Sequence, residues 1–115
     1  MHEYSIVEAL LARVEAEARA RGATTVHRLS VRIGELSGVE VDLLSAAYAT
    51  FRDRTICARA ELDIEPVAAA WACPECGAAI VRGAMLQCRQ CGVPARLTAG
   101  DEILLNRIEM EVPDV

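Results

Sequence analysis

The sequence predicts an α+β fold in which two helices pack on a three-stranded, mainly antiparallel sheet, and in which a small four-cysteine ribbon is inserted before the last strand. Three observations predict this architecture. Apolar residues recur at helical spacing in two segments, near residues 5–21 and 39–52. In three other segments apolar and polar residues alternate, which is the pattern of a half-buried strand. Two Cys-x-x-Cys pairs separate the last alternating segment from the others, so its strand returns to the sheet after an insertion.

Length and composition describe one small, aliphatic domain. A chain of 115 residues has the usual size of a single domain, and its 53% of hydrophobic residues include only 3% of aromatic ones. No apolar run approaches the roughly 20 residues that cross a bilayer, and the N-terminus lacks the pattern of a signal peptide. We therefore expect a cytoplasmic protein with no membrane partner.

The charge balance disfavours nucleic acid as a partner. The formal net charge is −5, and an acidic protein does not bind the phosphate backbone in bulk. The cysteine-rich segment has a basic cast, but Trp71 is its only aromatic residue for base stacking. We therefore expect protein partners rather than DNA or RNA, and the sequence leaves a homodimer open.

The first helix is predicted over residues 5–21. Ser5 followed by Glu8 has the spacing of a capping box, and Gly22 supplies a C-terminal stop. The apolar residues between these signals fall on one helical face: Ile6, Val7, Leu10, Leu11, Val14 and Ala18.

The first strand is predicted over residues 24–35 and the second helix over residues 39–52. Ser37 and Glu40 repeat the capping-box spacing ahead of this helix. The inward positions of the strand are Leu29, Val31 and Ile33. The apolar stripe of the helix is Leu44, Ala47, Tyr48 and Phe51.

Alternation returns around residues 61–65 and 107–112, which predicts the second and third strands. The segment between them is rich in glycine and proline and has no long amphipathic pattern, so it is expected to form the ribbon. The predicted main domain is then discontinuous. It spans residues 1–70 and 98–115, and the ribbon spans residues 71–97.

The four cysteines of the ribbon are the most specific signal in the chain. Cys73 and Cys76 form one Cys-x-x-Cys pair, Cys88 and Cys91 form another, and 11 residues separate the pairs. A two-residue gap lets both sulfurs of a pair reach one ion at about 2.3 Å, and the glycine after each pair lets the backbone turn back toward the sulfurs. The two pairs therefore predict a tetrahedral four-thiolate site, and structural Zn²⁺ is the preferred ion.

Two other uses of this site stay open from the residues alone. Four thiolates also suit iron, as in a rubredoxin-like electron carrier, although most of the chain would then have no role. A zinc ribbon can also act as a protein-interaction adaptor. We expect no enzyme, because four cysteines leave no open coordination position and the chain has no Ser-His-Asp set or glycine-rich phosphate loop.

The N-terminus carries a second set of candidate ligands, Met1, His2 and Glu3. The α-amine of Met1, the amide nitrogen of His2 and the imidazole Nδ1 of His2 can chelate one ion in fused rings. Glu3 can add its amide nitrogen or its carboxylate. An all-nitrogen square plane of this kind suits Ni²⁺ or Cu²⁺, and its affinity should fall with pH through the range of the amine and the imidazole.

Several segments in matching order resemble the HypA/HybF family. They are Met-His-Glu-Tyr-Ser-Ile at residues 1–6, Ile-Gly-Glu-Leu-Ser-Gly-Val at residues 33–39, the two Cys-x-x-Cys pairs, and the closing segments 100–103 and 108–111. The resemblance covers essentially the whole chain. The family consists of nickel metallochaperones for NiFe-hydrogenase maturation.

The resemblance implies a non-catalytic protein that binds Ni²⁺ through Met1, His2 and Glu3 and carries structural Zn²⁺ on its four ribbon cysteines. It also implies a HypB-type GTPase maturation factor and the hydrogenase large-subunit precursor as partners, with urease as a further target for some members. The implied fold is a helix-and-sheet domain with an inserted zinc ribbon.

Two further residues of metal-binding type are expected to be structural. His27 is placed in phase with Leu29 in the first strand, so it is expected to be packed or hydrogen-bonded. Cys57 lies between Ile56 and Ala58, which is typical of a small buried apolar residue.

Overall fold

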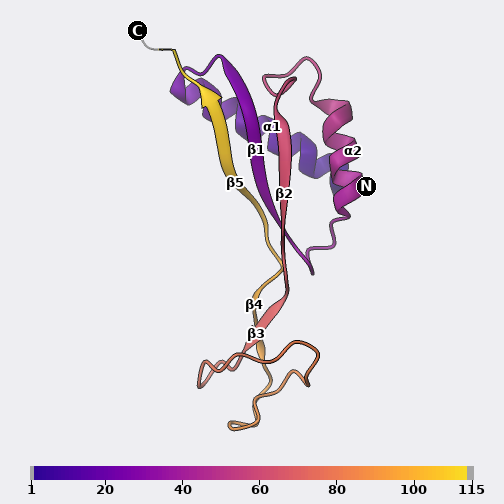
Figure 1. Ribbon diagram of the computed structural model, residues 1–115, viewed down its shortest axis with the longest axis vertical. Helices are drawn as coiled ribbons and strands as arrows, with labels where there is room; N and C mark the ends of the chain where they lie inside the picture. The colour runs from indigo at the N-terminus through magenta and orange to yellow at the C-terminus, as the bar shows by residue number, and fades with distance from the viewer. Residues whose placement is uncertain (1, 114–115) are drawn as a thin grey trace.

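The computed structural model describes residues 2–113, with His2 described through its backbone only. The molecule is elongated, with extents of 59 × 33 × 16 Å. Two helices and three strands form one part, which we call the body (Figure 1). The body consists of α1 (His2–Arg21), β1 (Thr25–Gly34), α2 (Val41–Phe51), β2 (Glu61–Val67) and β5 (Ile103–Glu111).

The segment from Ala70 to Ala99, which we call the ribbon, extends from the end of the body that is remote from the helices (Figure 1). It begins with β3 (Ala70–Ala72) and ends with β4 (Arg96–Ala99), and these two strands pair antiparallel. The sequence showed the ribbon but not this small sheet at its base, because segments of three and four residues are too short for a clear alternation.

The body sheet has the strand order β2-β1-β5. The α+β fold class predicted from the sequence is confirmed, but the description of the sheet as mainly antiparallel needs correction. β1 pairs antiparallel with β5 and parallel with β2, so the sheet is mixed. The reason is that α2 carries the chain back to the starting end of the sheet between β1 and β2, and a crossover of this kind joins parallel strands.

The core lies between the sheet and the helices. α1 crosses behind the sheet and α2 packs beside it (Figure 1). The largest fully buried side chains are Leu29, Leu44, Val7, Val14, Val26 and Cys57. The expectation that Cys57 is a buried apolar residue is therefore confirmed, and burial raises the pKa of its thiol.

A β-bulge changes the predicted phase of β1. The register with β5 shifts between Val26 and Arg28, so Val26 and Leu29 both face the core although they are three residues apart. His27 consequently points outward rather than into the core. Its Nε2 lies 3.2 Å from an Oε1 of Glu111, so of the two structural roles expected for it the hydrogen-bonded one is correct.

Both helices begin differently from the capping-box predictions. α1 already includes His2, so Ser5 lies inside the helix instead of capping it. α2 has Glu40 as its N-cap, with no side-chain cap bond from that residue. Ser37 instead accepts a hydrogen bond from the N–H of Val39. Neither helix of the described residues is long and apolar enough to cross a membrane.

A narrow connection, which we call the waist, joins the body to the ribbon at Gly34 and Gly100, where two backbone segments approach closely. The N–H of Leu36 donates to the carbonyl of Gly100 at 2.6 Å, and the N–H of Gly34 donates to the carbonyl of Glu102 at 2.7 Å. A Cβ at Gly34 would lie 2.2 Å from the oxygen of Gly100, and a Cβ at Gly100 would lie 2.5 Å from the Cα of Ala69. Only residues without a Cβ allow these backbones to approach so closely.

Candidate metal centres

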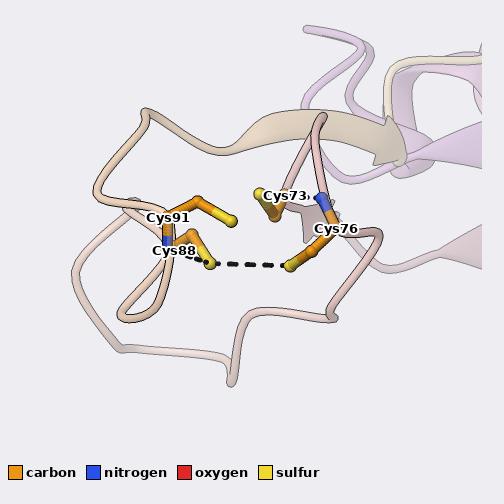
Figure 2. Close-up of side chains that lie close together, drawn as sticks. All are labelled: Cys73, Cys76, Cys88 and Cys91. Atoms are coloured by element: carbon orange, nitrogen blue, oxygen red, sulfur yellow. Dashed lines mark hydrogen bonds between the residues drawn. The ribbon is translucent and has the colours of Figure 1, made fainter.

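The four ribbon cysteines converge on one point. The Sγ atoms of Cys73, Cys76, Cys88 and Cys91 all lie within 4.8 Å of one another, and Figure 2 shows that they point inward from two loops. Cys76 Sγ and Cys88 Sγ are 3.7 Å apart. Four sulfurs at about 2.3 Å from a central ion in a tetrahedron are separated by about 3.8 Å, so the cluster has the size of a single-ion site.

Each Cys-x-x-Cys pair is held by the same backbone pattern. The N–H of Gly77 donates to the carbonyl of Cys73, and the N–H of Gly92 donates to the carbonyl of Cys88, both at 2.9 Å. These glycines have φ of 76° and 70°, the left-handed region that favours glycine. The turn predicted after each pair is therefore present, and it aims both sulfurs of a pair in one direction.

Backbone N–H groups stabilise negative charge on two of the sulfurs. Cys73 Sγ accepts from the N–H groups of Glu75 and Cys76 at 3.4 Å, and Cys88 Sγ accepts from the N–H of Cys91 at 3.4 Å. The donation from Cys76, reinforced by that from Glu75, lowers the pKa of Cys73 to about 7. By contrast, hydrogen bonding with the neighbouring thiols, Cys76 foremost, raises the pKa of Cys91. Four thiolates so close together need a cation, and this closed all-sulfur donor set fits Zn²⁺.

The N-terminal candidates are described only in part. Met1 and the side chain of His2 lie outside the described residues, so the structure places only Glu3 of this set. Glu3 is 5% exposed, and its Oε2 accepts a hydrogen bond from the backbone N–H of Glu40 at 3.1 Å. This bond, followed by one from its own N–H, lowers the pKa of the Glu3 carboxyl to about 2.

The contact between Glu3 and Glu40 joins the first turn of α1 to the first turn of α2. A carboxylate at a helix N-terminus compensates amide groups that have no partner within the helix. Glu3 therefore supplies to α2 the cap that the sequence assigned to Ser37. The sequence did not indicate this role, because the carboxylate comes from a residue 37 positions before Glu40 in the chain.

Glu35 is a second carboxylate whose role the sequence did not indicate. Its Oε1 accepts from the Ala69 N–H at 2.8 Å and from Arg82 Nη1 at 2.9 Å, and its Oε2 accepts from Arg82 Nη2. The Arg82 guanidinium and, secondly, the Ala69 N–H lower the pKa of this carboxyl to about 2. Because Arg82 belongs to the ribbon, this fork of hydrogen bonds ties the loop after β1 to the ribbon.

Comparison with known proteins places the whole chain in one family. Residues 1–110 match the family model described as HypA, hydrogenase/urease nickel incorporation, metallochaperone. The hydrogenase maturation factor HypA of Wolinella succinogenes is 40% identical, with 99% of this chain and 98% of the relative covered. That of Aquifex aeolicus is 37% identical, with 97% and 99% covered.

Two solved structures agree with this result. The solution structure of the Ni metallochaperone HypA from Helicobacter pylori superposes with a TM-score of 0.73 at 31% identity, covering 96% of this chain and 98% of the other. A second solution structure, of a HypA protein, gives a TM-score of 0.81 at 32% identity, with 98% of each chain covered. The chain therefore belongs to the HypA family of nickel metallochaperones, which act in hydrogenase and urease maturation.

Proposed function

We propose that this protein binds Ni²⁺ at its N-terminus, through Met1, His2 and Glu3, and carries the ion to a nickel enzyme under maturation. Membership of a nickel-incorporation family supports the identity of the ion. The chemistry of the donors supports the position, because an α-amine, amide nitrogens and an imidazole form the planar nitrogen set that Ni²⁺ favours.

Glu3 contributes its backbone amide nitrogen rather than its carboxylate. The carboxylate is nearly buried and is held by the N–H of Glu40, so recruiting it to an ion would remove the cap from α2. The carboxylate then has a supporting task. It fixes the first turn of α1, and with it the start of the ligand segment, against the body.

The four cysteines hold structural Zn²⁺, and their sulfur geometry is the observation that carries this assignment. We further propose that residues 71–97 act as a zinc-ribbon domain, and that residues 1–70 and 98–115 form the nickel-binding domain. A cluster of thiols of this kind suits a reducing compartment, which supports action in the cytoplasm.

The partners proposed are a HypB-type GTPase maturation factor and the hydrogenase large-subunit precursor, with urease as a second target. The protein itself is not an enzyme, so any nucleotide hydrolysis belongs to the GTPase. The ribbon supports contact with proteins, because Val81 and Met85 are 76% and 77% exposed and line the same pocket of the ribbon, and apolar side chains gathered in one exposed patch mark interaction surfaces.

The central experiment is a Ni²⁺ titration of wild type, His2→Ala and Glu3→Gln, with zinc quantified in each sample. We expect His2→Ala to lose nickel binding while zinc stays at one per chain, and we expect Glu3→Gln to keep its nickel affinity. A matched control is Glu8→Gln, an exposed carboxylate in the same helix. Nickel binding by His2→Ala equal to that of wild type would show that the N-terminal assignment is wrong.

Two further measurements separate the alternatives. A tag fused directly before Met1 converts the amine to an amide and should abolish nickel binding. Protein purified without added metal should be colourless with one zinc per chain. A red, redox-active protein would instead identify a rubredoxin-like iron site, and a zinc-loaded protein that binds its partners but never nickel would identify an adaptor.

A further inference from the structure

α1 begins within the proposed nickel-binding segment. Its first residue is His2, so the backbone of His2 and Glu3 is helical. Along a helix all N–H groups point toward the N-terminal end, whereas in an extended segment successive N–H groups point to opposite sides. The first four N–H groups of a helix have no acceptor within it. The amide nitrogens of His2 and Glu3 therefore face one side and can bind one ion without breaking a hydrogen bond of the helix ladder.

The first turn of α1 lacks the capping box that the sequence predicted. Ser5 lies inside the helix, so it does not cap the helix start. Helix ends fray unless other contacts fix them. The turn is held instead by a second element of the body, α2.

Two consecutive residues of this turn contact opposite ends of α2. Glu3 Oε2 accepts from the N–H of Glu40, the residue immediately before α2 begins. The ring of Tyr4 meets the ring of Phe51, the last residue of α2, edge to face, with centroids 5.3 Å apart and planes at 86°. This is one of the geometries that aromatic pairs prefer. Figure 1 shows the start of α1 beside α2, so the turn is held from both ends of that helix.

The ring contact lies outside the hydrophobic core. Tyr4 and Phe51 are 51% and 40% exposed, and neither belongs to the core cluster of the described residues. The core positions of the two helices are occupied by other side chains, among them Val7 and Leu44, which are 0% and 1% exposed. Removing the ring contact should therefore loosen the first turn of α1 and leave the packing of the body intact.

We propose that Tyr4 and Phe51 are positioning residues of the nickel site. Their ring contact holds the first turn of α1 in the helical form, which keeps the amide nitrogens of the ligand segment on one side. This inference rests on the N-terminal nickel site proposed above. A frayed helix end would have to become ordered when the ion binds, and that ordering costs conformational entropy. Because the ring contact orders the turn beforehand, it raises the nickel affinity although neither ring touches the ion.

The test is a Ni²⁺ titration of the zinc-loaded full chain at constant pH, with zinc quantified in each sample. Tyr4→Ala and Phe51→Ala should each raise the nickel dissociation constant by about threefold to tenfold, which is the range that the loss of one edge-to-face pair allows. Leu43→Ala is the matched control, because it truncates an apolar side chain of α2 that is 50% exposed. Its dissociation constant should stay within about twofold of wild type. Circular dichroism and zinc content identify any variant that has not folded.

A double-variant cycle separates the ring contact from independent effects of the two residues. The variant that combines Tyr4→Ala with Phe51→Ala should bind nickel no more weakly than either single variant, because the second truncation has no contact left to remove. Losses that multiply would show that the two residues act separately, which would overturn the proposal. Tyr4→Phe should retain the wild-type affinity, since an edge-to-face contact requires the ring and not the hydroxyl. An equal loss in Tyr4→Phe and Tyr4→Ala would exclude the ring contact as the cause.

Backbone mobility provides a second readout, which requires no nickel. In ¹⁵N relaxation of the zinc-loaded protein, the amides of Glu3 and Tyr4 should be more mobile in Phe51→Ala than in wild type, whereas those in the middle of α1 should be unchanged. Unchanged mobility of the first turn would overturn the proposal. Wild-type nickel affinity in Phe51→Ala would also overturn it, provided that His2→Ala has lost nickel binding. Nickel binding by His2→Ala would instead refute the N-terminal site itself, so the two failures are distinguishable.

Discussion

Gly34→Ala should destabilise the protein strongly, although Gly34 does not have the positive φ that usually reserves a position for glycine. The added Cβ would lie 2.2 Å from the oxygen and 2.3 Å from the carbon of the Gly100 carbonyl, and 2.7 Å from the nitrogen of Asp101. All three atoms are backbone, so no side-chain rotation relieves the contact. An ordinary contact of about 3.5 Å requires the two segments to separate by about 1 Å.

That separation has a definite energetic cost. Overpacking of this kind costs about 1–3 kcal/mol. Stretching the two waist hydrogen bonds, from Gly34 to Glu102 and from Leu36 to Gly100, adds about 1 kcal/mol each. The smaller entropy of the unfolded alanine chain returns about 0.4–1 kcal/mol. We therefore expect Gly34→Ala to lower the free energy of unfolding by about 2–5 kcal/mol.

Gly22→Ala is the matched control, because it measures the energetic cost of the backbone conformation without any steric contact of the added Cβ. Gly22 has a φ of 68° and nothing lies within 4 Å of an added Cβ. An L-residue in this conformation costs about 1–2 kcal/mol. Urea denaturation of the zinc-loaded variants, followed by far-UV circular dichroism, measures both changes. If Gly34→Ala is less destabilising than Gly22→Ala, the close approach of backbones at the waist is not the constraint described here.

Three other predictions follow from particular contacts. Tyr48→Phe removes the hydrogen bond from the buried hydroxyl to the Ala60 carbonyl, which Arg52 also contacts, so urea denaturation should show a loss of about 1 kcal/mol. Burial raises the pKa of Tyr48 to about 12, so the folded wild type keeps a proton that the unfolded chain releases above about pH 10. Its stability should therefore fall between about pH 10 and about pH 12 more steeply than that of Tyr48→Phe, and equal slopes would contradict this. Glu35→Gln at about pH 7 should increase the mobility of the ribbon in ¹⁵N relaxation. Because the folded pKa of Glu35 is about 2, the contribution of its ionised carboxylate to the stability of wild type should persist down to about pH 4.5 and decline only below it. Chelation of zinc should change the fluorescence of Trp71 but leave most of the helical circular dichroism, because the core of the body, among the described residues, contains no ribbon residue. Loss of the helical signal would show that the body and the ribbon unfold together.

The elements of the body could be predicted because each has one buried face. α1 buries Val7, Leu10, Val14 and Ala18, all of which the helical spacing identified. The cysteine cluster could also be predicted, since the spacing within each pair and the glycine after it are local properties. Information of this kind is contained in a few consecutive residues, so the sequence alone is sufficient to read it.

Element ends and pairings depended on residues far apart in the chain, and there the sequence misled. The bulge at His27 moved that residue out of the core phase, and a bulge leaves no signal in the alternation before it. The parallel pairing of β1 and β2 was accessible, because the predicted helix between two neighbouring strands already implies a crossover. The cap of α2 could not be predicted from the local sequence, because the carboxylate that completes it belongs to Glu3.

The loop between β1 and α2 shows why the body and the ribbon should be considered together. At its start, Glu35 holds Arg82 of the ribbon and the N–H of Ala69. At its end, the N–H of Glu40 donates to the carboxylate of Glu3, whose amide nitrogen is one of the proposed nickel ligands. Figure 1 places the ribbon and the start of α1 far apart along the molecule, yet this one short loop contacts both. The loop therefore forms hydrogen bonds both to the ribbon and to the first turn of α1, and residues from three separate parts of the chain determine its conformation.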